Sequence, residues 1–244
     1  MSKVKKRFLI ASISILSILI IVASAFFIYT AIYYHADNTA VNAYISAKPA
    51  IHNDKLSNAL AVYSDEWKAG IVFYPGGKVE YTAYSPLMYA LAERGYYCIL
   101  VKMPLNLAIF KPNAANNFIG SNDIAHWYIA GHSLGGSMAA KCASSNAEKL
   151  DGLILLGAYS INDLSSTSLK ALSIYGSEDM VLNKSKYDKN RSNLPTDFTE
   201  YVIEGGCHAY YGMYGAQKGD GTPAISNIEQ IEMTADIIAE FIGL

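Results

Sequence analysis

Cysteine is scarce in this chain of 244 residues, which contains only three. Cys98, Cys142 and Cys207 are odd in number and predict no disulfide framework, and none has zinc-ligand spacing with another cysteine or a histidine pair. Cys98 lies in a strand-like run and Cys142 in a helix-like one, which is typical of buried small apolar side chains. We therefore expect no metal site, and the sequence predicts no cofactor.

Basic residues are also scarce after the N-terminus. Four of the 19 Lys and Arg residues lie at positions 3, 5, 6 and 7, so the residues after Phe8 carry 15 cations against 21 anions. A mildly acidic body without a basic cluster argues against nucleic acid as a partner. With 52% hydrophobic residues, the chain is long enough to bury the core of one globular domain and to carry an appendage.

Charge is absent altogether from residues 8–34, a mostly apolar run of 27 positions. A membrane helix needs about 20. The basic segment 1–7, with no equally basic segment after the run, predicts a single-pass cell-membrane protein with a cytoplasmic N-terminus and an extracytoplasmic body. The alternative is a cleavable signal peptide, since Ala23-Ser24-Ala25 resembles a cleavage site. We favour the anchor because the run is long and cleavage would leave an apolar mature terminus at Phe26.

After the anchor, residues 35–54 are expected to form a connector and residues 55–244 a globular domain. Apolar runs predict strands at 60–63, 69–74, 96–102, 127–130, 153–156, 172–175 and 201–203. Helical patterns lie between them, notably at 81–93, before about 147 and at 226–242, and a short helix capped near Asp37 precedes them. This alternation predicts an α/β fold, with a mostly parallel sheet covered by helices on both faces. Ligands of such sheets bind at the C-terminal ends of the strands.

The chain is organised around Trp127–Ala140, where Gly131-His132-Ser133-Leu134-Gly135 has the spacing G-x-S-x-G. A strand before it and small helix-compatible residues after it predict a sharp turn that presents Ser133 at the top of the sheet. The backbone N–H of Leu134, at the start of the helix, would then point to where an oxyanion forms. The alternative is a strand-to-helix turn that needs small residues only for packing.

A nucleophilic serine needs a histidine base, and the histidine needs a carboxylate that orients it. Asp179 follows the strand 172–175, with Glu178 and Asp163 as alternatives, and a solvated acidic turn is the non-catalytic interpretation. His208 follows the last strand and a Gly-Gly pair, whereas Cys207 beside it is expected to pack. The other histidines are less suitably placed: His35, His52, His126 and His132.

A second oxyanion donor is expected in Pro75-Gly76-Gly77-Lys78, directly after the strand 69–74. Glycines there let a backbone N–H approach the substrate oxygen. We predict the Gly77 N–H for this role, with the Lys78 N–H as its rival. The Lys78 side chain is expected to be solvated, although an anionic substrate group would attract it.

Together, the serine turn, Gly176-Ser177-Glu178-Asp179 and Gly206-Cys207-His208-Ala209 resemble the α/β-hydrolase superfamily over about residues 55–243. The segment Tyr74–Lys78 resembles a small, often membrane-anchored bacterial branch of it. The resemblance implies these roles: Ser133 as nucleophile, His208 as base, Asp179 as orienting acid, and Leu134 with Gly77 as oxyanion hole. Pro75 departs from the pattern, because many members have histidine before the loop glycine.

Only about 40 residues separate the serine turn from the acid, which leaves no room for a large lid domain. An open site favours a small or accessible ester. We therefore expect a serine hydrolase of the carboxylesterase type that acts through an acyl-enzyme on a small-molecule ester or other acyl substrate. A thioesterase, peptidase or acyltransferase on the same triad is an alternative, as is a non-catalytic membrane-anchored binding protein with this fold.

Overall fold

The computed structural model describes residues 2–244 and divides into two compact units, one ending at Tyr33 and one comprising Tyr34–Leu244. The first unit is a single helix, α1 (Lys3–Ala31), whose first turn is capped by the Ser2 hydroxyl. With 29 residues and a mean hydropathy of 2.6 over its most apolar part, α1 is long and apolar enough to cross a membrane. Residues 8–31 of the uncharged run thus lie in one continuous helix, whereas residues 32–34, which were expected in the anchor, lie beyond its end.

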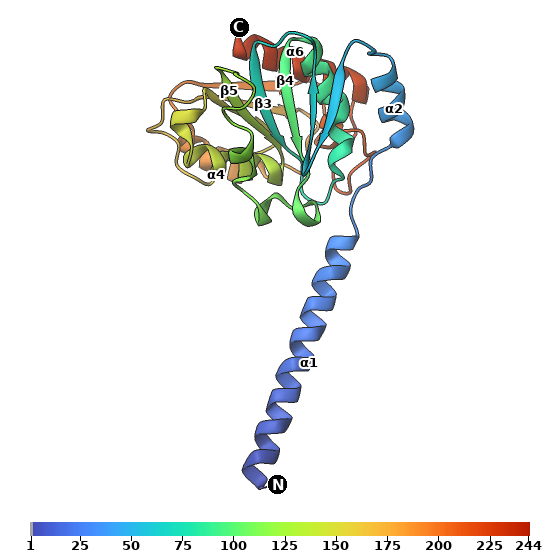
Figure 1. Ribbon diagram of the computed structural model, residues 1–244, viewed down its shortest axis with the longest axis vertical. Coiled ribbons are helices and arrows are strands. Elements are labelled where there is room, and N and C mark those ends of the chain that lie inside the picture. Colours follow the sequence, from blue (N-terminus) through green and yellow to red (C-terminus); the bar gives the residue numbers. More distant parts are fainter. Residues whose placement is uncertain (1) are drawn as a thin grey trace. The chain divides into compact units, whose positions relative to one another are not determined.

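The second unit is built on one sheet of eight strands in the order β1-β2-β4-β3-β5-β6-β7-β8 (Figure 1). The strands are β1 (His52–Leu56), β2 (Ala59–Tyr63), β3 (Ala69–Tyr74), β4 (Tyr96–Val101), β5 (Trp127–His132), β6 (Gly152–Leu156), β7 (Lys170–Gly176) and β8 (Phe198–Ile203). All strands from β3 to β8 run parallel, and β2 is antiparallel to both β1 and β4. The prediction of a mostly parallel sheet is confirmed.

Helices cover both faces of this sheet. They are α2 (Asn38–Ser46), α3 (Ser85–Glu93), α4 (Leu134–Ser144), α5 (Lys184–Asn190) and α6 (Asn227–Ile242). Buried side chains of α3 and α6 form one hydrophobic cluster, and those of α4 form a second with the opposite faces of β3, β4 and β5. Short 3-10 turns complete the unit: η1 (Tyr81–Tyr84), η2 (Pro104–Asn106), η3 (Ala108–Phe110), η4 (Ala114–Asn117), η5 (Ala147–Lys149), η6 (Arg191–Asn193) and η7 (Ala209–Tyr211).

Several elements differ from the expectation; β8, for example, begins at Phe198 rather than at residue 201. Strand β1 was not predicted, because all five of its side chains are exposed and its sequence HNDKL has no apolar alternation. The helix expected over 81–93 begins as η1 and becomes α-helical only at Ser85, directly before Pro86. Helix α4 ends at Ser144 rather than near 147, where the Asn146 side-chain amide donates to the Cys142 carbonyl oxygen at 2.9 Å.

Residues 35–54, expected as a connector, contain α2 and the first residues of β1. Tyr34 is bonded to the segment after β3: its N–H donates to the Lys78 carbonyl, and its own carbonyl accepts from the Glu80 N–H, both at 2.8 Å. It thereby forms a short parallel bridge with Val79. The chain therefore enters the second unit beside the glycine-containing loop that follows β3.

Candidate active site

Ser133 lies in a strained turn between β5 and α4. Its backbone has φ 53° and ψ −123°, a conformation that side-chain-bearing residues rarely adopt. The turn is tight because a Cβ atom on Gly135 would lie 2.2 Å from the Pro75 carbonyl oxygen, and one on Gly131 would lie 2.6 Å from the Gly135 carbonyl carbon. The glycines of the G-x-S-x-G motif therefore permit the backbone contacts on which the turn depends.

Asp179 and His208 form a buried pair at the C-terminal edge of the sheet. The His208 Nδ1 and the Asp179 Oδ2 are 2.8 Å apart, and the two residues are 1% and 2% exposed respectively. The other carboxylate oxygen accepts from the backbone N–H groups of Val181 at 3.0 Å and Leu182 at 2.8 Å. A carboxylate bound in this way fixes the ring, with its proton on Nδ1. The His208 Nε2 is buried and, among residues 2–244, has no hydrogen-bond partner.

The alternative acids lie elsewhere. Glu178 accepts a hydrogen bond from the Ser177 hydroxyl at 3.1 Å. Asp163 is bonded to the backbone and hydroxyl of Ser165, and these bonds lower the pKa of its carboxyl group. The structure thus brings Asp179, and neither alternative, to His208. Three other histidines pair with carboxylates away from Ser133, as His35–Glu80, His52–Asp65 and His126–Asp151.

The two predicted oxyanion donors, Leu134 and Gly77, belong to segments that pack against each other. Leu134 begins α4, so its N–H has no partner within the helix. The loop after β3 packs against it, since a Cβ atom on Gly77 would lie 2.8 Å from the Leu134 Cδ2. In the described part of the chain, the Gly77 N–H has no hydrogen-bond partner, whereas the Lys78 N–H donates to the Asn106 carbonyl at 2.8 Å. The geometry therefore favours Gly77 over Lys78 as the second donor.

Tyr84, which the sequence reasoning missed, connects the glycine loop to the serine turn. Its buried hydroxyl accepts from the Gly76 N–H at 3.1 Å and lies 2.8 Å from the His132 Nδ1. Burial, and then the neighbouring His208, whose ring centre is 4.4 Å away, lower the pKa of His132 well below its usual 6.5. A neutral His132 accepts the Tyr84 O–H at Nδ1, whereas its buried Nε2 has no hydrogen-bond partner among residues 2–244. No local motif around Tyr84 indicates this contact.

Two further side chains hold the acid and histidine loops. The fully buried Gln230 binds both backbone groups of Cys207, at 2.9 Å to the N–H and 2.8 Å to the carbonyl. Asp220 accepts from the Ala209 N–H at 2.8 Å and from the Met180 N–H at 3.3 Å, so it joins the two loops. Burial raises the pKa of the Cys207 thiol to about 12, which suits a packing role and not a nucleophilic one.

Ser133 and His208 line the same small pocket, which has a volume of 220 Å³. Pockets for drug-sized ligands have volumes of about 300–1,000 Å³, so this pocket suits a smaller group. Ser137, Tyr159 and Asn183 contribute to its wall. A larger, open cavity of 960 Å³ lies at the other end of the strands, and none of the described residues that line it belongs to the predicted site. Over residues 2–244, no three His, Cys, Asp or Glu side chains are grouped to hold a metal ion.

The chain was compared with known protein families and sequences. The sequence profile described as the alpha/beta hydrolase family matches residues 70–232. No curated protein sequence matches the chain.

Solved structures share the fold at low sequence identity. Dienelactone hydrolase from Anabaena variabilis ATCC 29413 is 12% identical with a TM-score of 0.60, over 79% of this chain and 97% of that one. A predicted CIB-like hydrolase from Thermoplasma acidophilum is 16% identical with a TM-score of 0.57, over 78% of this chain and 99% of its own. A membrane phospholipase A, described as a bacterial virulence factor, is 13% identical with a TM-score of 0.59, over 98% of both chains.

Proposed function

Because the chain belongs to the alpha/beta hydrolase family, we propose that it is a serine hydrolase that cleaves a small ester through an acyl-enzyme. One observation carries the proposal: the strained Ser133 and His208, which is bonded to the buried Asp179, line a single pocket. A strained serine and a histidine at one pocket, with a carboxylate bonded to the histidine, are the groups that acyl transfer requires.

In the proposed reaction, the Ser133 hydroxyl attacks the ester carbonyl and the His208 Nε2 takes its proton. Asp179, held by two backbone N–H groups, orients the imidazole and stabilises its charged form. The Leu134 and Gly77 N–H groups receive the negative charge that develops on the carbonyl oxygen. His208 then protonates the leaving alcohol, and a water molecule activated by the same histidine releases the acid.

The pocket favours an ester with a short acyl group. Its volume of 220 Å³ is below the range of drug-sized sites, and no large lid separates it from solvent in the chain between Ser133 and Asp179. The proposed partner is thus a small-molecule ester. We further propose that α1 anchors the protein in the cell membrane, with the N-terminus in the cytoplasm and the second unit outside, because the basic residues lie at the N-terminal end of the helix, before its uncharged part.

Labelling of the full chain by a fluorophosphonate probe tests the proposed nucleophile. Wild type should label, and Ser133→Ala should not. Ser137→Ala is the matched control, since Ser137 lines the same pocket but its hydroxyl donates to the Tyr159 carbonyl at 2.8 Å. Labelling that survives in Ser133→Ala, or a folded wild type that does not label, would exclude the proposed reaction. In a series of p-nitrophenyl esters, the rate of hydrolysis should decrease once the acyl chain is too long for the pocket.

A further inference from the structure

The second unit has most of its strongly exposed apolar side chains at one edge of its sheet. Its large apolar residues that are at least 50% exposed are Ile109, Phe110, Ile161, Met180 and Ile228. The first four follow the C-terminal ends of β4, β6 and β7, which are parallel strands. Loops after parallel strands lie at the same edge, and Ser133 follows β5 there. We call Ile109, Phe110, Ile161 and Met180 the apolar rim.

Residues 102–111 show how the chain builds part of this rim. Leu107 and Ala108 are buried, and η3 packs against α4, so the adjacent Ile109 and Phe110 face outward. Exposing several apolar side chains to water at one edge of the sheet is energetically unfavourable. Such a cluster therefore indicates an interaction surface. Because the inner residues fix the backbone of η3, the two outer side chains are held in place.

The charge beside Ile109 and Phe110 is basic, in contrast to the rest of the unit, whereas Asp163 lies near Ile161 in the chain and Asp220 is bonded to Met180. Lys102 and Lys111 flank the segment, and the chain has no Asp or Glu between Glu93 and Asp123. The residues after Phe8 as a whole have an excess of anions, 21 against 15. Apolar side chains flanked by lysines are the combination that suits the surface of an anionic lipid bilayer.

The path of the chain also joins the rim to the membrane helix. Only three peptide steps lead from Ala31, the last residue of α1, to Tyr34, which at 3.8 Å per step span at most about 11 Å. Tyr34 donates to the Lys78 carbonyl, and the Lys78 N–H donates to the Asn106 carbonyl of η2, both at 2.8 Å. The loop that receives the anchor is thus bonded to the segment that carries Ile109.

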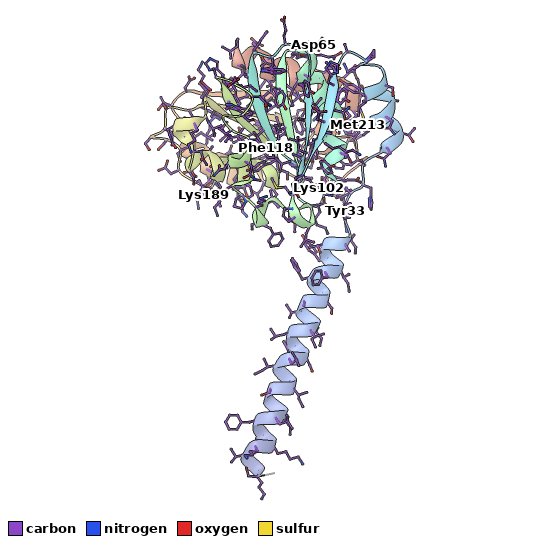
Figure 2. The ribbon with its side chains drawn as sticks, viewed as in Figure 1. Tyr33, Asp65, Lys102, Phe118, Lys189 and Met213 are labelled. Carbon is purple, nitrogen blue, oxygen red and sulfur yellow. The ribbon has the colours of Figure 1, made fainter. Side chains whose placement is uncertain are left out.

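We propose that the apolar rim and its flanking lysines dock on the surface of an anionic bilayer, as a membrane contact additional to α1. The proposal rests on α1 spanning the membrane and is independent of the proposed ester hydrolysis. Docking would turn the C-terminal edge of the sheet, and with it the Ser133 pocket, toward the lipid surface. The opposite end of the strands, where Asp65 lies away from Lys102 (Figure 2), would face the aqueous phase.

Fluorescence from the full chain in lipid vesicles tests this docking. An environment-sensitive probe is attached to Ile109→Cys, since the three native cysteines are buried, and to Glu66→Cys as the matched control at the opposite end. Alkaline extraction first selects protein whose α1 is inserted, so a failed anchor is distinguished from failed docking. We expect a blue shift and quenching by headgroup-labelled lipids for the probe at 109 alone. Equal water exposure of both probes in inserted protein would overturn the proposal.

Removal of the lysines tests the choice of an anionic bilayer. Each of Lys102→Gln and Lys111→Gln should weaken the docking equilibrium in phosphatidylglycerol-containing vesicles by about fivefold. Lys170→Gln, which removes an exposed lysine at the N-terminal end of β7, should leave it unchanged. Docking that is equally strong on zwitterionic vesicles, or equally sensitive to all three substitutions, would contradict the proposed partner. A rim that binds another protein instead would stay water-exposed in these vesicles.

Discussion

Replacing Tyr84 by phenylalanine removes one hydroxyl that joins the glycine loop to the serine turn. The Tyr84 ring is fully buried, so the ring should stay in place and the contacts of its oxygen, including the one with the Tyr214 hydroxyl, should be lost. In the native protein, the Tyr84 hydroxyl lies 3.1 Å from the Gly76 N–H and 2.8 Å from the His132 Nδ1. The substitution leaves both groups without this hydrogen-bond partner. Because Gly76 directly precedes Gly77, the change acts on the position of the proposed oxyanion donor.

The expected size of the effect follows from these contacts. Each buried polar group that loses its partner destabilises the folded protein by about 1–3 kcal/mol. Part of this loss is offset, because the removed tyrosine hydroxyl no longer has to be desolvated on folding. We therefore expect a net destabilisation of about 2 kcal/mol. In a chain of this length, that lowers Tm by about 4–8 °C. Complete loss of one oxyanion donor reduces kcat by about 10²–10³, and a displaced donor should cost less, about tenfold. KM should change little, because the oxyanion forms only in the transition state.

Tyr211→Phe is the matched control for Tyr84→Phe. The Tyr211 ring also lies against His132, at 5.2 Å between ring centres, but its buried hydroxyl has no hydrogen-bond partner among residues 2–244. Its removal should leave kcat unchanged and Tm unchanged or higher. Steady-state hydrolysis of a small activated ester and calorimetry on the full chain in detergent measure both quantities. Equal kcat values for the two variants would refute the role given to the Tyr84 hydroxyl.

Three further predictions concern buried groups near the site. Gly157→Ala should reduce kcat by at least about a hundredfold with a smaller loss of stability, because Gly157 has φ 51° and its Cβ would lie 2.9 Å from the His208 Nδ1. Gln230→Leu should destabilise the protein by about 2–4 kcal/mol in denaturant unfolding, because it leaves the Cys207 N–H and carbonyl unsatisfied. The free energy of unfolding should also decrease as the pH falls below 6.5. Because the pKa of His132 is lowered in the folded protein, only the unfolded chain binds a proton at this residue in that pH range. This one group should therefore lower the free energy of unfolding by about 1.4 kcal/mol per pH unit.

Each of these has an outcome that would contradict it. A Gly157→Ala variant with normal kcat would show that the His208 loop moves aside without consequence. Unchanged unfolding in Gln230→Leu would mean that water satisfies the Cys207 backbone. For the pH prediction, His132→Asn should show a shallower acid slope than wild type, and identical slopes would place the acid sensitivity in other groups.

The main elements could be predicted because their signals are local. Strand β3 occupies the predicted 69–74, and α6 begins after Ser226, whose hydroxyl and the Glu229 side chain form a capping box. The order of serine, acid and histidine along a parallel sheet also predicted an acid between Ser133 and His208, with Asp179 preferred to Glu178 and Asp163. The structure places Asp179 there.

The supporting contacts could not be predicted, because they join distant positions without a pattern. Tyr84 and His132 are 48 residues apart, and Gln230 and Cys207 are 23 apart. An amide or hydroxyl side chain carries no sign of the backbone group that it will satisfy. Strand β1 was missed for a related reason, since an edge strand with both faces exposed needs no apolar side chains.

The bridge between Tyr34 and Val79 sets a limit for protein engineering. A soluble form that began at Ala36 would lack Tyr34, and with it the acceptor of the Glu80 N–H and the donor to the Lys78 carbonyl. The cut would remove a β-partner from the loop next to Gly77, although it lies 97 residues before Ser133 in the chain. Secreted or crystallisable versions of this protein should therefore keep Tyr34, and fusion partners should be joined upstream of it.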